Sequence, residues 1–281
     1  MEDSAPGALY LVATPIGNLG DISERAAQTL RDVDFIAAED TRVTRKLLEH
    51  LHIKKPLISY YEHNSLTSGE KILGRILVGE NCALVTDAGT PGISDPGEHM
   101  VALCAKAGVT TTPIPGPCAA VAALSSSGLA AGRFAFEGFL STARKSRFDR
   151  LNELKTEKRT MVFYEAPHKL LRTLKDMLSV LGDRKLTISR EMTKVFEEIL
   201  RLDLSQAILH FENTPPRGEF VLVIEGAKET PVNEDIFGDA VKSASALIDD
   251  GLSVKDAVKA VALQTGVAKN ALYNAVMNQR R

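Results

Sequence analysis

The sequence is poor in cysteine and has no tryptophan. Its 281 residues include only three cysteines, Cys82, Cys104 and Cys118. No two of them have the CxxC or Cys/His spacing of a zinc site, so we expect no metal. Thiols this sparse are typical of reduced, mostly buried cysteines, and they favour a cytosolic protein.

Long apolar runs and a surplus of charge are also absent. No run approaches the roughly 18 apolar residues of a membrane-spanning helix, and the acidic start of the chain does not resemble a signal peptide. The formal net charge is −2, so a nucleic-acid-binding surface would have to be a local patch. A hydrophobic content of 44% and a charged content of 25% are typical of a globular chain with a sizeable core.

In the first 117 residues, short apolar runs alternate with amphipathic segments. This alternation predicts a parallel sheet with helices on both faces. The first helix is predicted to begin at a capping box made by Asp21 and Glu24. The predicted strands cover residues 8–14, 35–40, 56–64, 82–89 and 109–117.

A second unit of alternating strands and helices follows. Its sheet is predicted to be mixed, because residues 197–204 alternate apolar and polar side chains as a half-exposed antiparallel strand does. The rest of the chain is predicted to be helical; its last two helices resemble a helix-turn-helix, with Ser253 as an N-cap. The fold class is therefore α/β, with domains at 1–117 and 118–228 and a small helical piece at 229–281. The second unit's predicted strands are 134–140, 160–167, 185–193, 197–204 and 218–226, and its helices are 119–129, 146–159 and 169–182.

Three loops rich in glycine and proline follow predicted strands of the first unit. They read TPIGNLGD (14–21), DAGTPGISDPG (87–97) and PIPGPCAA (113–120). None is a GxGxxG loop or a P-loop. Each alone is often only a tight turn, but ligands of open α/β sheets bind at this edge. Three such loops together predict a backbone-lined trough that suits a nucleoside-containing ligand better than a triphosphate.

Two charged segments at strand ends are candidates for chemistry. MVFYEAPHK (161–169) places Tyr164 and Glu165 at the end of a buried strand, and SREMTKVFEE (189–198) contains Glu191 and Lys194. Both segments also suit a structural role, as a core aromatic, a helix-terminal charge or an ion-pair network. His168 alone favours a surface or capping role over catalysis.

Basic residues are concentrated in two segments. Residues 141–159 contain seven basic and three acidic side chains, and residues 252–281 contain five basic and one acidic. Either segment alone is consistent with a solvated helix, but both together suggest a footprint for a phosphate backbone. The candidate RNA contacts are Arg144, Lys145, Arg147 and Arg150, then Lys255, Lys259, Lys269, Arg280 and Arg281 in the tail, with Arg42 and Arg45 as weaker candidates to face a substrate.

The motifs together resemble a known enzyme family. LYLVATPIGNLGDISERA, AAEDTRVTRKLL, VTDAGTPGISDPG, PIPGPCA, FYEAPHKL and REMTKVFEE are similar to the small-subunit (16S) ribosomal RNA 2′-O-methyltransferase I family, of the tetrapyrrole-methylase-like superfamily. The resemblance runs from about residue 9 to 226 and extends more weakly into the tail. It implies a class III methyltransferase fold that clasps S-adenosylmethionine (SAM) between two domains, a homodimer, and a cytidine 2′-hydroxyl of 16S rRNA in the small ribosomal subunit as the methyl acceptor.

The resemblance also implies roles for individual residues. Pro15 would flank the cofactor, the loop after the fourth strand would hold it, and residues near 118 and 163–166 would complete the site. The implied cofactor-binding residues are Pro15, Asp87, Ala88, Gly89, Thr90, Ile93, Ser94, Cys118, Ala119, Phe163, Tyr164 and Ala166.

A ribose 2′-hydroxyl is a weak acid, so a base or a cationic neighbour should help it lose its proton. Asp87, Glu165, Glu191 and Lys194 are candidates; Asp87 is better suited to the cofactor's ribose hydroxyls, and the other three remain unranked catalytic candidates. This chemistry requires no metal. Two alternatives stay open: a methyltransferase acting on a small tetrapyrrole, which the basic segments argue against, and a non-enzymatic ribosome-assembly factor, which would bind RNA without SAM.

Overall fold

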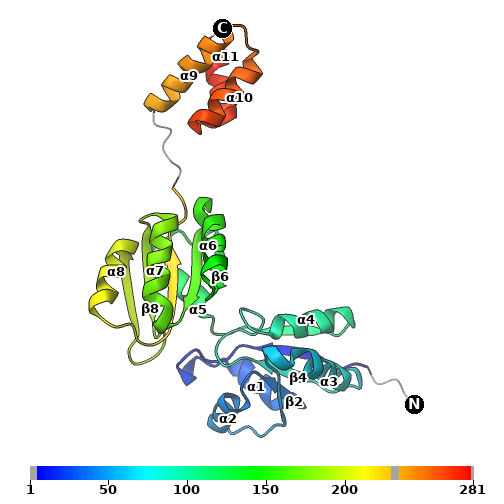
Figure 1. Ribbon diagram of the computed structural model, residues 1–281. Coiled ribbons are helices and arrows are strands. Elements are labelled where there is room, and N and C mark those ends of the chain that lie inside the picture. The colour runs from blue at the N-terminus through cyan, green and yellow to red at the C-terminus, as the bar shows by residue number, and fades with distance from the viewer. Residues whose placement is uncertain (1–4, 229–233, 280–281) are drawn as a thin grey trace. The chain divides into compact units, whose positions relative to one another are not determined.

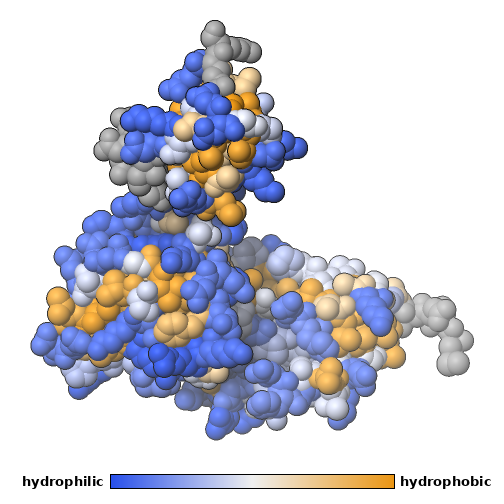
Figure 2. Space-filling view, turned by 45° about the horizontal axis from the view of Figure 1, so that its top comes forward, coloured by the Kyte–Doolittle hydropathy of each residue, from blue (hydrophilic) through white to orange (hydrophobic). Residues whose placement is uncertain are grey.

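The structure is a computed structural model that describes residues 5–228 and 234–279. The chain folds into two compact units, residues 1–227 and 228–281, and each is described by itself. The first unit contains two sheets, and the second contains helices (Figure 1). Hydrophilic residues cover most of the face seen in Figure 2, as expected for the outer sides of helices.

The first sheet has five strands in the order β3-β2-β4-β1-β5, and all of its pairings are parallel, as predicted. One face packs under α3 and α4, and the other under α1 and α2 (Figure 1). Because both faces are covered, β2 and β4 consist of buried residues only. The elements are β1 (Leu9–Val12), α1 (Glu24–Asp32), β2 (Phe35–Ala38), α2 (Thr41–His50), β3 (Leu57–Ser59), α3 (Ser65–Leu77), β4 (Cys82–Val85), α4 (Gly97–Lys106) and β5 (Thr111–Ile114).

The start of α1 differs from the prediction. Its N-cap is Ser23, whose hydroxyl accepts a hydrogen bond from the N–H of Ala26. Asp21 belongs to a separate 3-10 turn, η1 (Leu19–Asp21), capped by Asn18. The capping box assigned to Asp21 is therefore wrong, because a serine closer to the helix occupies the capping position.

The second sheet has the order β6-β7-β10-β8-β9 and is mixed, as predicted. Its β6 and β7 are parallel, whereas β10 runs antiparallel to β7 and β8, and β9 runs antiparallel to β8. Helix α5 covers one face, and α6, α7 and α8 cover the other. The elements are α5 (Ala119–Ser126), β6 (Phe134–Phe139), α6 (Arg144–Glu153), β7 (Thr160–Glu165), α7 (Pro167–Leu181), β8 (Lys185–Arg190), β9 (Glu198–Asp203), α8 (Leu204–Asn213) and β10 (Phe220–Ile224).

Helix α8 was not predicted from the sequence. It follows β9 without an intervening loop, so the apolar pattern passes directly from one element to the other. Its start is a capping box between Asp203 and Gln206, which is the local signal that marks it.

In its described residues, the C-terminal unit is a cluster of three helices, α9 (Glu234–Asp249), α10 (Val254–Thr265) and α11 (Lys269–Gln279), around a small apolar core. The prediction of Ser253 as an N-cap is confirmed, since its side chain accepts from the N–H of Asp256. Gly266, with φ of 73°, ends α10 in the left-handed conformation that favours glycine. Among the described residues, no helix is long and apolar enough to cross a membrane.

Candidate active site

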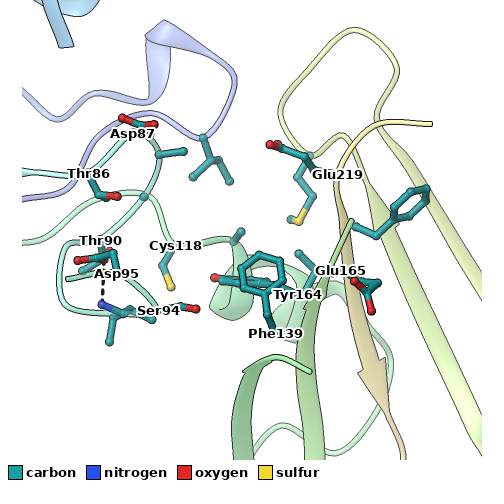
Figure 3. A pocket seen from close by; sticks show the side chains of 18 of the residues that line it. Thr86, Asp87, Thr90, Ser94, Asp95, Cys118, Phe139, Tyr164, Glu165 and Glu219 are labelled. Atoms are coloured by element: carbon teal, nitrogen blue, oxygen red, sulfur yellow. Dashed lines mark hydrogen bonds between the residues drawn. The ribbon is translucent and has the colours of Figure 1, made fainter. Parts of the chain in front are cut away.

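A cavity of about 550 Å³ lies within the first unit, and both sheets contribute to its walls. The loops that follow β2 and β4 form one wall, and the ends of β6, β7, β8 and β10 form much of the other (Figure 3). The lining residues are Ile16, Glu39, residues 86–90 and 93–95, Cys118, Ala119, Phe139, residues 164–167, Ser189, Met192 and residues 219–221.

The loop after β4 is held in shape by its own side chains. The carboxylate of Asp95 accepts hydrogen bonds from the N–H groups of Gly92 at 2.9 Å and Gly97 at 2.7 Å. Gly89 exchanges two backbone hydrogen bonds with Thr14, of the loop after β1. The Thr90 hydroxyl donates to the carbonyl of Pro117 after β5. The three glycine-rich loops are therefore joined into one wall.

Two acidic side chains meet on this wall. Glu39, at the end of β2, accepts hydrogen bonds from the Thr86 hydroxyl and from the N–H of Asp87. Asp87 accepts from the N–H of Asp40 at 3.0 Å. Burial, together with the charges of Glu39 and Asp40, raises the pKa of Asp87. The hydrogen bond from Arg42 lowers the pKa of Asp40 to about 2.

Glu39 was not predicted to be a site residue from the sequence. The signal in the sequence is a pair of consecutive carboxylates at the end of a buried strand. Ser189, Met192 and Glu219 also line the cavity without having been assigned to it.

The opposite wall is mainly aromatic and apolar, and it also includes Glu165 and Glu219. The hydroxyl of Tyr164 accepts a hydrogen bond from the N–H of Ala120 at the start of α5, and the rings of Phe136 and Phe139 pack against it. Burial raises the pKa of Tyr164 to about 12, so the phenol stays neutral. Glu165 is buried, and its carboxylate accepts from the N–H of Ala166 and from a buried hydroxyl on α7.

Two residues expected to bind the cofactor do not line the cavity. The side chain of Phe163 packs in the core beneath α7, because successive residues of a strand point to opposite faces of the sheet. Tyr164 consequently lines the cavity and Phe163 does not. Ile16, and not Pro15, is the residue of the first loop that lines it. The other expected cofactor residues all belong to the lining.

Glu191 and Lys194 lie beside the cavity without lining it. The ammonium of Lys194 donates to Glu191 and to Glu219, each at 2.9 Å. Burial lowers the pKa of Lys194, but these two hydrogen bonds outweigh it and leave the pKa raised. The hydrogen bond from Lys194 lowers the pKa of Glu191. The two groups are therefore a charged pair at neutral pH, and Lys194 is not a proton acceptor there.

The turn that carries this pair packs against the loop after β1. A Cβ added at Gly17 would lie 2.5 Å from Cγ of Lys194 and 2.9 Å from the hydroxyl of Thr193. Glu191 and Thr193 have φ of 49° and 66°, an uncommon conformation for these residue types. The surrounding packing holds this strained turn in place.

The basic residues of α6 do not share one environment. Arg147 is buried and bonds Asp176 at 2.7 Å and two backbone carbonyls at 3.0 Å, which differs from the prediction that it contacts RNA. Arg150 pairs with Glu137 and Glu153. Arg144 and Lys145 are exposed and have no carboxylate partner in the described part of the chain. The same holds for Lys255, Lys259 and Lys269 in the C-terminal unit. Arg280 and Arg281 lie outside the described residues.

Of the two residues of α2 that were predicted to face a substrate, one is engaged in an ion pair. Arg42 is engaged with Asp40, whereas Arg45 is exposed. Within residues 5–228 and 234–279, no group of histidine, cysteine, aspartate or glutamate side chains has the arrangement of a metal site.

Comparison with known proteins identifies relatives along most of the chain. Residues 8–208 match the family model of the Tetrapyrrole (Corrin/Porphyrin) Methylases, and residues 238–280 match that of the RsmI C-terminal HTH domain. Ribosomal RNA small subunit methyltransferase I of Synechocystis sp. is 49% identical over 95% of this chain and 96% of its own length. The protein of the same name from Escherichia coli O157:H7 is 44% identical over 99% of this chain and 97% of its own length.

Solved structures with the same fold are more distant. The native form of uroporphyrin III C-methyl transferase from Thermus thermophilus has a TM-score of 0.56 at 15% identity and covers 78% of this chain and 97% of its own. Diphthine synthase has a TM-score of 0.60 at 12% identity and covers 78% and 90%. At these identities the likeness concerns the fold alone.

Proposed function

The chain belongs to the ribosomal RNA small subunit methyltransferase I family of the tetrapyrrole methylases, and on this premise we propose that it methylates a ribose 2′-hydroxyl of a cytidine in 16S rRNA, with SAM as donor. The observation that carries the proposal is the cavity with one acidic, backbone-lined wall and one aromatic wall. Its volume lies in the range that holds ligands of this size.

The lining residues fit the donor. SAM supplies a methyl group already activated on a positively charged sulfur. Glu39 and Asp87 suit that charge and the ribose hydroxyls, while Phe139, Tyr164 and Val221 suit the flat apolar purine. The backbone of residues 87–90 and of 118–119 lines the cavity, where alignment of the acceptor with the methyl carbon would supply several kcal/mol of barrier lowering.

We assign the proton-accepting role to Glu165. It contributes to the cavity lining, but its carboxylate accepts from Ala166 and Thr173 on the face of β7 that packs against α7, so accepting the proton requires the side chain to turn towards the cavity. Glu191 and Lys194 act as a positioning pair that holds Glu219 at the rim. Glu165→Gln should lower kcat about a hundredfold or more, with little change in the affinity for S-adenosylhomocysteine. Wild-type turnover in this variant would remove Glu165 from the mechanism.

RNA is proposed to bind along the edge where α6 and α7 begin. Because β6 and β7 are parallel and each is followed by a helix, both helices start at the same edge, where Phe139 and Pro167 line the cavity. Neither start has a side-chain cap, but α7 begins with Pro167, which has no N–H, so α6 is the helix that offers free N–H groups to a phosphate. Arg144 and Lys145 lie on the first turn of α6, and Lys169 and Arg172 lie on the first two turns of α7.

The test is transfer of labelled methyl from SAM to purified small ribosomal subunits that lack the modification, followed by nuclease digestion and nucleoside analysis. A labelled 2′-O-methylcytidine derivative supports the proposal. Label on another nucleoside, or none with SAM still bound, would point to a different acceptor. Failure to bind SAM at all would favour a ribosome-assembly role.

The family membership also leads us to propose a cytoplasmic homodimer. Light scattering of the purified full chain measures this directly. A monomer at micromolar concentration would contradict it.

A further inference from the structure

The charge of the cavity has one sign. Among the described residues that line it there are five carboxylates and no lysine or arginine. The electrostatic environment of a ligand therefore depends on which of these carboxylates the chain itself has neutralised. The five are Glu39, Asp87, Asp95, Glu165 and Glu219.

Three of the five are engaged by other groups of the chain. Asp95 accepts from three backbone N–H groups of its own loop. Glu165 accepts from a backbone N–H and from the hydroxyl of Thr173. Glu219 is paired with the ammonium of Lys194 and is largely exposed. Of the three, only Glu219 has a cationic partner, while the carboxylates of Asp95 and Glu165 are directed at donors of their own loop and of α7.

Glu39 and Asp87 also have neutral partners, but they differ in lying next to each other on one wall of the cavity. Glu39 accepts from the Thr86 hydroxyl and from a backbone N–H, and Asp87 accepts from the backbone N–H of Asp40. The guanidinium of Arg42 is occupied by Asp40, which it bonds through two nitrogens. Burial and the charge of Glu39 raise the pKa of Asp87 by more than the nearby charge of Arg42 lowers it.

We propose that Glu39, together with Asp87, makes this cavity prefer the positively charged methyl donor over its neutral product. The proposal rests on the proposed function. Methyl transfer forms a bond from the ribose oxygen to the methyl carbon and breaks the bond from that carbon to sulfur. The bonding electron pair stays on sulfur and the hydroxyl proton passes to a carboxylate, so the sulfur loses its positive charge.

After the transfer, Glu39 and Asp87 no longer have a positively charged sulfur to attract. Attraction to the acidic wall favours binding of the donor, and its loss after transfer favours release of the product. Glu39 acts here as a specificity-determining residue, because a purely structural role in holding Thr86 and Asp87 would affect both ligands alike.

The experiment measures Kd of SAM and of S-adenosylhomocysteine by calorimetry with the full chain at low salt. Glu39→Gln removes the charge and keeps an oxygen that accepts from Thr86. We expect it to reduce the preference for SAM over S-adenosylhomocysteine about three- to tenfold, as for one partly screened charge. Glu49→Gln is the matched control, because it makes the same change in net charge on the exposed last turn of α2. It should leave the preference unchanged.

The two proposals fail differently. A wild-type protein that binds neither ligand would overturn both. Binding of both ligands with the same preference in wild type and Glu39→Gln would overturn the charge-selection proposal and leave the proposed function intact. A loss of affinity that is equal for the two ligands would also overturn it. If Glu39→Gln does not fold, Asp87→Asn provides the same comparison.

Discussion

Replacing Arg147 by alanine should destabilise the protein without removing a direct contact to RNA. The guanidinium is buried, with 3% of the side chain exposed, and its partner Asp176 is 17% exposed. The substitution would leave Asp176 with little water and no cation, and would remove the donor to the carbonyls of Ser141 and Thr142. Breaking a buried ion pair of this kind costs about 3–5 kcal/mol.

For a unit of this size, each kcal/mol corresponds to about 2–4 °C in Tm. Arg147→Ala should therefore lower Tm by roughly 6–20 °C, measured by circular dichroism on the full chain. The double variant Arg144→Ala and Lys145→Ala is the matched comparison, since both side chains are exposed on the same helix. Each of its substitutions should change stability by no more than about 0.5 kcal/mol.

In RNA binding, the double variant should be affected and Arg147→Ala should not. Loss of two phosphate contacts should reduce the slope of log affinity against log salt for small ribosomal subunits by about 1.5 in the double variant. Arg147→Ala, measured below its own Tm, should keep the wild-type slope. A Tm within about 2 °C of wild type for Arg147→Ala, or a reduced slope in that variant, would refute the reasoning.

Three further substitutions have definite expected outcomes. Asp87→Asn should raise the Tm of the ligand-free protein at neutral pH, because a raised pKa means that ionised Asp87 costs stability. The difference in Tm between variant and wild type should narrow as pH falls, since Asp87 of the wild type is then protonated. A difference in Tm that stays constant with pH would contradict this. Gly17→Ala should lower the rate of methyl transfer, because the added Cβ would displace the turn at Lys194. Activity equal to that of the wild type would contradict this. Ser253→Ala should destabilise the C-terminal unit by about 1 kcal/mol through loss of the N-cap, seen as faster amide exchange in α10 with β-sheet exchange unchanged.

The sheets themselves were predictable, because they depend on local patterns. Uninterrupted apolar runs such as those of β2 and β4 predict strands covered on both faces, and the parallel and mixed sheets were confirmed. Ser253 was found for the same reason, since a cap acts on a residue three positions away. The predicted N-cap of α1 was wrong because two candidate capping residues, Asp21 and Ser23, lie within three positions and only Ser23 caps the helix.

The site was only partly predictable. The glycine-rich loops identify which strand ends carry it, and most of the expected residues line the cavity. Phe163 was misplaced because adjacent strand residues face opposite ways, and the sequence alone does not tell which face is covered by core helices. Glu39 was missed because its role depends on Thr86 and Asp87, 47 and 48 positions further along the chain.

The sequence by itself determined the order of the elements other than α8, the classes of the two sheets, the family and the loops that bear the site. Only the tertiary structure decided which charges are available to a ligand. Arg144 and Arg147 lie three residues apart on one helix, yet one is exposed and the other is bonded to Asp176, 29 positions away. Helix and strand patterns arise from neighbours in the chain, whereas the state of a charge depends on burial and on partners brought close by folding.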